Sequence, residues 1–201
     1  MRILAGLIPY EKGEVTIAGN AVTGTMDQVG VVFQNSNLLP WLNLQDNLTL
    51  GLKVSGDTVS PETVTAMLET LGLCGFEKNF PHELSGGMRH RVAIGQALIR
   101  NPGVLLMDEP FGALDALTRD RLNMELLRIW QAERKTVVLI THSISEAVLL
   151  SDRVLVLSDR PGRLLEEVSI DLPRPRDPSQ TREDSQFGDY VVQLSQLMGV
   201  K

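Results

Sequence analysis

Two short apolar runs in the second half of the chain restrict the fold more than any other feature. Val104–Met107 is a run of apolar residues between Pro-Gly and two acids, which predicts a buried strand, and Thr136–Ile140 predicts another. Between them, apolar residues recur at helical spacing from 122 to 130. Strands that alternate with helices are typical of α/β folds with a largely parallel sheet, so we expect that fold class.

The remaining pattern predicts one domain over 1–201 that contains a smaller unit. Residues 1–7 resemble the last turn of a helix. Further strands are expected at 14–19, 29–33, 154–157 and 164–170, and helices from 61, over 85–100 and from 143. The stretch 41–100 is mostly helical and is expected to be a subdomain. After Pro173 the composition changes to Pro, Arg, Asp and Ser, which predicts a C-terminal extension over 173–201 with an extended linker and a short helix at 187–198.

Composition excludes several classes of protein. The 201 residues are 43% hydrophobic and can build a core. A net charge of -6 argues against nucleic acid as the main partner. Cys74 is the single cysteine, so an internal disulfide is excluded. No apolar run approaches the roughly 18 residues that span a bilayer, and no signal peptide is recognisable. We expect a cytosolic chain that reaches a membrane only through partners.

Asp108 and Glu109 follow the first of the two apolar runs. This position is the carboxyl edge of a parallel sheet, where α/β folds bind ligands. One carboxylate could hold Mg²⁺ through water, and the other could orient a water molecule that attacks a phosphate. A solvated acidic turn is an equally good interpretation of these two residues alone.

Ser85-Gly86-Gly87 opens a predicted helix. Glycines allow a ligand to approach the backbone, and the free amides of a helix N-terminus favour an anion. A serine in this place can also simply cap the helix.

Three further polar residues have two interpretations each. Gln34 follows a strand and could bind a metal ion or water, or be an ordinary surface residue. His142 follows another strand and could contact a phosphate, or be a cap or a local hydrogen-bonding residue. Asp115 could belong to a binding loop or be the N-cap of the helix after it.

Taken together, the order and spacing of these residues resemble the nucleotide-binding subunit of ABC transporters. Gln34 matches the Q-loop, Leu84–Met88 the signature loop, Val104–Glu109 Walker B, Asp115 the D-loop and His142 the switch histidine. The resemblance implies a P-loop NTPase-like ABC ATPase core with an inserted helical subdomain, and ATP and Mg²⁺ as cofactors.

The resemblance also implies roles and partners. Glu109 and His142 would be catalytic, Asp108 and Gln34 would hold Mg²⁺, and Ser85, Gly86 and Gly87 would bind ATP held by the opposite subunit. The partners would be a second ATPase subunit, transmembrane permease subunits and, indirectly, a solute-binding protein, with no nucleic acid. The subunit would be peripheral at the cytoplasmic face of the cell membrane.

Several segments narrow the resemblance to bacterial importers for nitrate, sulfonate or taurine. They are Phe33-Gln34, Leu38-Leu39-Pro40-Trp41, Asp46-Asn47, Ser158–Arg163 and Asp171–Arg176. The chain departs from the family at His90, where Gln is usual, and at Gly95-Gln96, where Ala-Arg is usual. We expect these changes to affect the packing of the helix and to leave function intact.

The phosphate-binding motif G-x-x-x-x-G-K-[ST], Walker A in this family, does not occur in the sequence. Residues 1–7 resemble the end of the helix that normally follows it, so we expect a sequence truncated at its N-terminus. The alternative is a non-hydrolysing subunit that donates only its signature loop to an intact partner. A homodimer would then lack a complete site, whereas a heterodimer could have one.

Overall fold

The computed structural model describes residues 1–112, 116–133 and 135–199. The chain forms two compact units. The first comprises Met1–Asp115 and Glu133–Ile140, and the second comprises Ala116–Ala132 and Thr141–Lys201.

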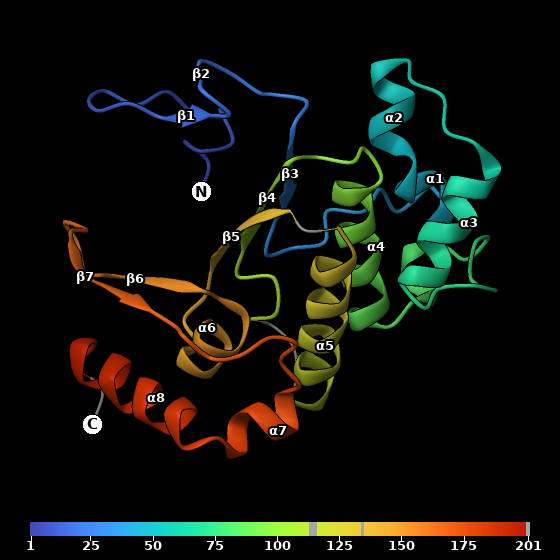
Figure 1. Ribbon diagram of the computed structural model, residues 1–201. Coiled ribbons are helices and arrows are strands. Elements are labelled where there is room, and N and C mark those ends of the chain that lie inside the picture. The colour runs from blue at the N-terminus through green and yellow to red at the C-terminus, as the bar shows by residue number, and fades with distance from the viewer. Residues whose placement is uncertain (113–115, 134, 200–201) are drawn as a thin grey trace. The chain divides into compact units, whose positions relative to one another are not determined.

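The first unit is built on a parallel sheet of three strands in the order β3 (Val29–Val32), β4 (Val104–Asp108) and β5 (Thr136–Ile140) (Figure 1). The middle strand is the most deeply buried of the three, and Leu105–Met107 is almost completely buried. Its last residue, Asp108, pairs with Ile140 in the register of β4 and β5. The predicted α/β class with a parallel sheet is confirmed, and the carboxyl ends of β4 and β5 reach the same edge.

Strand β5 differs from the expectation of a buried strand. Its side chains alternate between exposed and half-buried, and Val138 and Ile140 are 36% and 40% exposed. Within the described residues β5 pairs with β4 alone, so it forms an edge of the sheet. The apolar sequence predicted the strand correctly but its burial wrongly, because burial depends on what covers the strand.

The segment before the sheet also differs in detail from the expected strand at 14–19. It is a hairpin of two short antiparallel strands, β1 (Thr16–Ile17) and β2 (Asn20–Ala21). Ala18 and Gly19 connect them with φ values of 50° and 78°. Positive φ at both central residues is what a type I′ hairpin turn requires, so the chain reverses after Ile17 and does not continue as one strand.

The helices of the first unit follow the hairpin and β3. They are α1 (Leu44–Leu48), α2 (Leu50–Ser55), α3 (Pro61–Thr70), the 3₁₀ helix η1 (Pro81–Glu83) and α4 (Gly86–Leu98). The first turn of α3 has Pro61 at its start and Ser60 as its cap, since the Ser60 side chain accepts a hydrogen bond from the Thr63 amide. Both features are common at helix starts, which explains why this boundary was predictable.

Helix α4 packs on α1 and on Leu71, the residue that caps the end of α3. Asn47 is completely buried, and its side chain holds the loop before α1 through hydrogen bonds that include the Leu39 amide and carbonyl. Gln96 on α4 donates to the Asn47 carbonyl at 2.7 Å. A Cβ at Gly95 would lie 2.4 Å from a Leu71 methyl carbon, so the absent side chain allows this approach. The two departures Gly95 and Gln96 thus lie in the packing between these helices.

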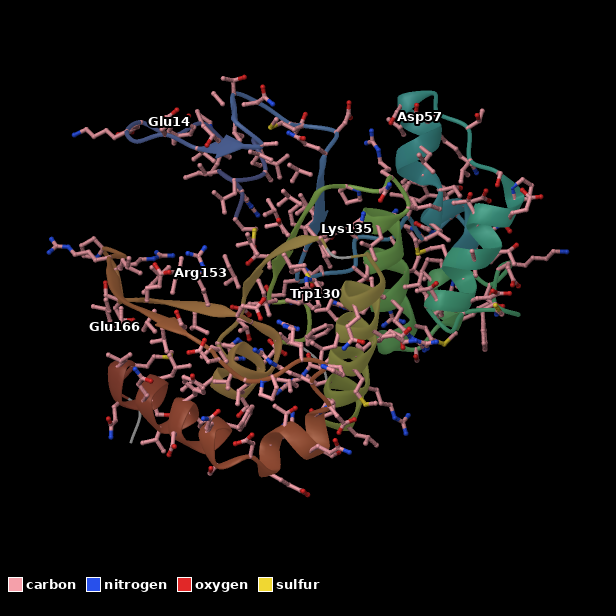
Figure 2. The ribbon with its side chains drawn as sticks, in the orientation of Figure 1. Glu14, Asp57, Trp130, Lys135, Arg153 and Glu166 are labelled. Atoms are coloured by element: carbon pink, nitrogen blue, oxygen red, sulfur yellow. The ribbon has the colours of Figure 1, made fainter. Side chains whose placement is uncertain are left out.

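The second unit contains α5 (Ala116–Glu133), α6 (Ile144–Leu150), the antiparallel pair β6 (Arg153–Leu157) and β7 (Leu164–Ser169), α7 (Pro178–Glu183) and α8 (Ser185–Leu197) (Figure 1). Arg153, labelled in Figure 2, lies on the exposed side of this hairpin. It pairs with Glu167 on β7 at 3.0 Å. The other side packs on an apolar core made of Leu127, Val148, Leu149, Val156, Val168, Ile170, Leu172, Phe187 and Leu194.

The C-terminal segment packs on its own unit, which corrects the expectation of an extended linker after Pro173. Two helices, α7 and α8, replace most of that linker, and α8 begins at Ser185, before the predicted 187. Phe187 and Leu194 enter the core. Trp130 lies on α5 (Figure 2). The Arg174 guanidinium lies 4.0 Å from its ring centroid. The prolines and charges of this segment suggested a linker, because the sequence alone does not show what its arginines contact in the folded unit.

Arg176 is the most deeply buried charge of this segment, with a side chain 1% exposed. Its guanidinium donates to the backbone carbonyls of Val148, Leu149, Ser151, Ile170 and Leu172. Three of these carbonyls lie at the C-terminal end of α6, where helices leave acceptors unpaired. Burial lowers the pKa of Arg176 from its usual value.

The ion pair between Arg182 and Asp120 makes the stability of the second unit depend on pH. Arg182 on α7 donates to both carboxylate oxygens of Asp120 on α5, at 2.9 and 2.6 Å, and these bonds lower the pKa of Asp120 below its usual 3.8. A carboxyl with a lowered folded pKa stabilises the fold at pH above 3.8, and this contribution is lost as the pH falls through the folded pKa.

We therefore expect Asp120→Asn to lower the urea midpoint of this unit at pH 7 and to have a smaller effect at about pH 3, below the usual pKa of the carboxyl. Trp130 fluorescence in a Trp41→Phe background reports on this unit alone, because Trp41 lies in the other one. Asp159→Asn, at an exposed carboxylate of the same unit, is the control and should change neither midpoint. An Asp120→Asn effect of equal size at both pH values would contradict the assignment.

No helix in the described part of the chain is both long and apolar enough to cross a membrane.

Candidate functional site

The turn after β4 carries the two acids that the sequence singled out. Asp108 is the last residue of the strand and Glu109 is the first residue after it, and both are half-buried. Glu109 has a φ of 44°, a left-handed conformation that is uncommon for a residue with a side chain. Its amide donates to the Ile140 carbonyl at 2.9 Å, and its carbonyl accepts from the Gly112 amide at 3.2 Å. The sheet edge and the turn together hold Glu109 in this conformation.

Gln34 meets Glu109 across the sheet edge. Its Nε2 donates to Glu109 Oε2 at 3.2 Å, although the two residues are 75 positions apart in sequence. The contact follows from the register, because Val32 pairs with Met107 and the chain after each strand leaves at the same edge. Glu109 is thus part of a polar contact between two strand ends, a more specific arrangement than a solvated acidic turn.

The segment 85–87 forms the beginning of α4. Ser85 is the N-cap, and its Oγ accepts a hydrogen bond from the Met88 amide at 3.2 Å. The capping interpretation of this serine therefore holds for the structure. It does not exclude an anion site, because Ser85 is exposed and the amides of Gly86 and Gly87 belong to the first turn, whose donors have no partner within a helix.

His142 belongs to the second unit. It is exposed and lies between the end of β5 and the start of α6. The next residue, Ser143, caps α6 by accepting a hydrogen bond from the Glu146 amide at 3.4 Å, and its own amide donates to Thr141 Oγ1. Ser143, and not His142, is therefore the cap of α6. Asp115, the remaining candidate, lies outside the described residues.

Asp108 and Gln34 were predicted to hold Mg²⁺. Within the described ranges no group of three or more His, Cys, Asp and Glu side chains could enclose a metal ion. Mg²⁺ keeps several waters and commonly takes only one or two protein oxygens. One Asp108 carboxylate and one Gln34 amide oxygen at the same edge of the sheet fit such an open site.

One buried residue beside these loops, Phe111, was not identified from the sequence. Phe111, two residues after Glu109, is 1% exposed, and its ring centroid lies 6.1 Å from that of His90 on α4. The pairing of β4 with β5 could have suggested that the Ile140 carbonyl accepts a hydrogen bond from the Glu109 amide. No sequence pattern pointed to the contact between His90 and Phe111.

The comparisons with known proteins agree on one family. The family model of the ABC transporter matches residues 1–112. An uncharacterized ABC transporter ATP-binding protein of Methanocaldococcus jannaschii is 50% identical over 200 residues, which cover 98% of this chain and 73% of that protein. The taurine import ATP-binding protein TauB of Escherichia coli is 46% identical over 176 residues, which cover 87% of this chain and 69% of TauB.

Among solved structures, the chain is similar to a dimeric ATP-binding cassette in a post-hydrolysis state bound to ADP and Pi. The TM-score is 0.71 at 30% sequence identity, over 86% of this chain and 79% of the other. The likeness therefore includes most of both chains.

Proposed function

The chain belongs to the ABC transporter family of ATP-binding proteins, and from that premise we propose that it is the ATP-hydrolysing subunit of an importer for a small anion such as nitrate, a sulfonate or taurine. The observation that carries the proposal is the contact of Gln34 with Glu109 at the carboxyl edge of the parallel sheet. This is the edge at which α/β folds bind ligands.

Within this proposal Glu109 is the general base for the attacking water. Glu109 is half-buried, its carboxylate accepts a hydrogen bond from Gln34, and its amide donates to the Ile140 carbonyl, so its direction is set before a substrate arrives. A base that is positioned in advance contributes more to phosphoryl transfer than a mobile one, since that chemistry depends on positioning and electrostatics.

Asp108 and Gln34 would hold Mg²⁺ when ATP is bound, and the ion would supply charge for the phosphate oxygens. The amides at the start of α4, with Ser85, Gly86 and Gly87, would face the phosphates of ATP on an opposite subunit. His142 would contact the terminal phosphate. Asp115, which matches the D-loop motif in sequence, would contribute to the same site.

The domain organisation is part of the proposal. We assign one nucleotide-binding domain to 1–201, a helical subdomain with the signature loop to 41–100, and a C-terminal extension to 173–201. The partners would be a second ATPase subunit and transmembrane permease subunits, with a solute-binding protein that delivers the anion to them. The subunit would lie at the cytoplasmic face of the cell membrane. The dimeric state of the similar solved cassette supports the first partner.

The anion class rests on the taurine import relative and on sequence segments. TauB is identical at 46% of aligned positions. In this chain Asn47 organises the loop that contains Leu38-Leu39-Pro40-Trp41, one of the segments that resemble such importers, and Trp41 is 69% exposed. An exposed tryptophan on a loop held by buried hydrogen bonds is suited to contact a permease subunit.

Uptake of labelled anions by cells that express the whole transporter tests this proposal. We expect ATP-dependent uptake of taurine, an alkanesulfonate or nitrate, and loss of uptake in Gly87→Asp, which places a carboxylate where phosphate oxygens would bind. Cys74→Ser, at an exposed residue outside the site, is the control and should leave uptake unchanged. If the cells take up none of the three anions, or if uptake persists in Gly87→Asp, the proposal is contradicted.

A further inference from the structure

His90 is a polar residue in an apolar place. It lies on α4 and is 7% exposed, and its Nε2 has no hydrogen-bond partner among the described residues. Burial lowers the pKa of His90, which keeps the imidazole neutral. A buried polar atom without a partner reduces stability, so its presence calls for an explanation other than packing.

The ring that His90 contacts belongs to the turn of Glu109. The His90 and Phe111 ring centroids are 6.1 Å apart with the planes tilted by 48°, a geometry at which aromatic rings attract each other. Phe111 is 1% exposed and follows Pro110, which restricts the backbone before it. The hydrogen bond from the Gly112 amide to the Glu109 carbonyl closes the turn. A displacement of the Phe111 ring would therefore be transmitted to Glu109.

On the other side, His90 belongs to the first turns of α4. Gly86 and His90 are four residues apart, so they share one face of the helix. The first turn is fixed at its end by the Ser85 cap and from the side by Arg89, which donates to the Pro81 and Leu84 carbonyls. Because these bonds hold the first turn together, a shift of His90 is expected to reach the glycines of segment 85–87.

We infer that His90 is a positioning residue whose contact with Phe111 couples the Glu109 turn to the segment 85–87 of the same subunit. This inference rests on the proposed function, under which Glu109 acts on one ATP and the segment 85–87 contacts another. A subunit with this coupling adjusts both of its nucleotide contacts together. The buried imidazole of His90 is the flat ring that lies between the backbone of α4 and the Phe111 ring.

Amide hydrogen exchange of the purified chain tests the coupling without any activity. The Gly112 amide reports on the Glu109 turn and the Met88 amide on the Ser85 cap. We expect His90→Ala to accelerate exchange at both amides by roughly tenfold relative to the unchanged chain. His90→Gln keeps a planar polar side chain and should restore more than half of the protection at both.

Val64→Ala is the matched control. Val64 is 6% exposed and lies on α3, which carries none of the site residues, so its truncation also creates a cavity in the first unit. It should leave both amides unchanged. Equal acceleration in Val64→Ala and His90→Ala, or acceleration at one amide only in His90→Ala, would overturn the coupling.

Kinetics of the assembled transporter provide the second readout. We expect His90→Ala to lower kcat for ATP hydrolysis roughly tenfold with the KM for ATP changed less than about twofold, because a misplaced group affects the chemical step more than binding. A raised KM with an unchanged kcat would overturn the inference. If the transporter that carries no substitution fails to hydrolyse ATP, the proposed function is refuted. The hydrogen-exchange results would still decide whether His90 couples the two segments.

Discussion

Glu109→Gln is expected to reduce ATP hydrolysis by the assembled transporter by roughly 10²- to 10³-fold. The amide retains the size of the side chain and can still contact Gln34, but it cannot accept the proton of the attacking water. Removal of a positioned general base typically costs this much. The two strand ends should keep their places, because the Glu109 amide still donates to the Ile140 carbonyl.

Kinetics and nucleotide binding measured on the same preparation check this expectation. ATP binding should change less than about twofold, since the loss lies in the chemical step. Glu166→Gln is the matched control, because it makes the same change at an exposed position on β7 and should leave hydrolysis unchanged. Residual hydrolysis above about a tenth of the original rate would mean that another group is the base.

Arg176→Met is expected to lower the free energy of unfolding of the second unit by about 3 kcal/mol or more. The methionine side chain fills much of the same volume but donates no hydrogen bond. Its introduction leaves buried carbonyls at the end of α6 and before the C-terminal segment without a donor. Unsatisfied buried carbonyls cost far more than the hydrogen bonds of an exposed arginine contribute.

Urea unfolding followed by Trp130 fluorescence in the Trp41→Phe background measures this effect in the second unit. Arg163→Met makes the same change at an exposed arginine on the hairpin and should cost less than about 0.5 kcal/mol. Arg176→Lys should fall between them, because one ammonium cannot reach all the acceptors of a guanidinium. A cost for Arg176→Met similar to that for Arg163→Met would show that the segment is not held by this side chain.

The parts of the site that could be predicted from the sequence are those that strand ends and helix caps determine. Val104–Met107 is apolar and ends in two acids, and this pattern correctly predicted a strand with Asp108 and Glu109 at the edge of the sheet. Ser85 was predicted as a possible cap and is one. These features are local, or follow from the rule that parallel strands end together, so a single sequence contains them.

The features that could not be predicted depend on distant neighbours. Arg176 stands in a stretch of prolines and charges that resembles a linker, and only the fold brings the carbonyls of α6 to its guanidinium. The exposure of Val138 on β5 depends on which strands pair beside it. The contact of His90 with Phe111 joins residues 21 positions apart in elements whose packing no periodicity reveals.

ATP hydrolysis by membrane vesicles that contain the whole transporter tests the central claim most directly. The rate is measured with and without a solute-binding protein loaded with taurine, an alkanesulfonate or nitrate. We predict that one of the loaded binding proteins raises hydrolysis severalfold and that Glu109→Gln abolishes the increase. Hydrolysis that none of the three loaded binding proteins raises, or an increase that survives Glu109→Gln, would contradict the assignment of this chain as the ATP-hydrolysing subunit of a small-anion importer.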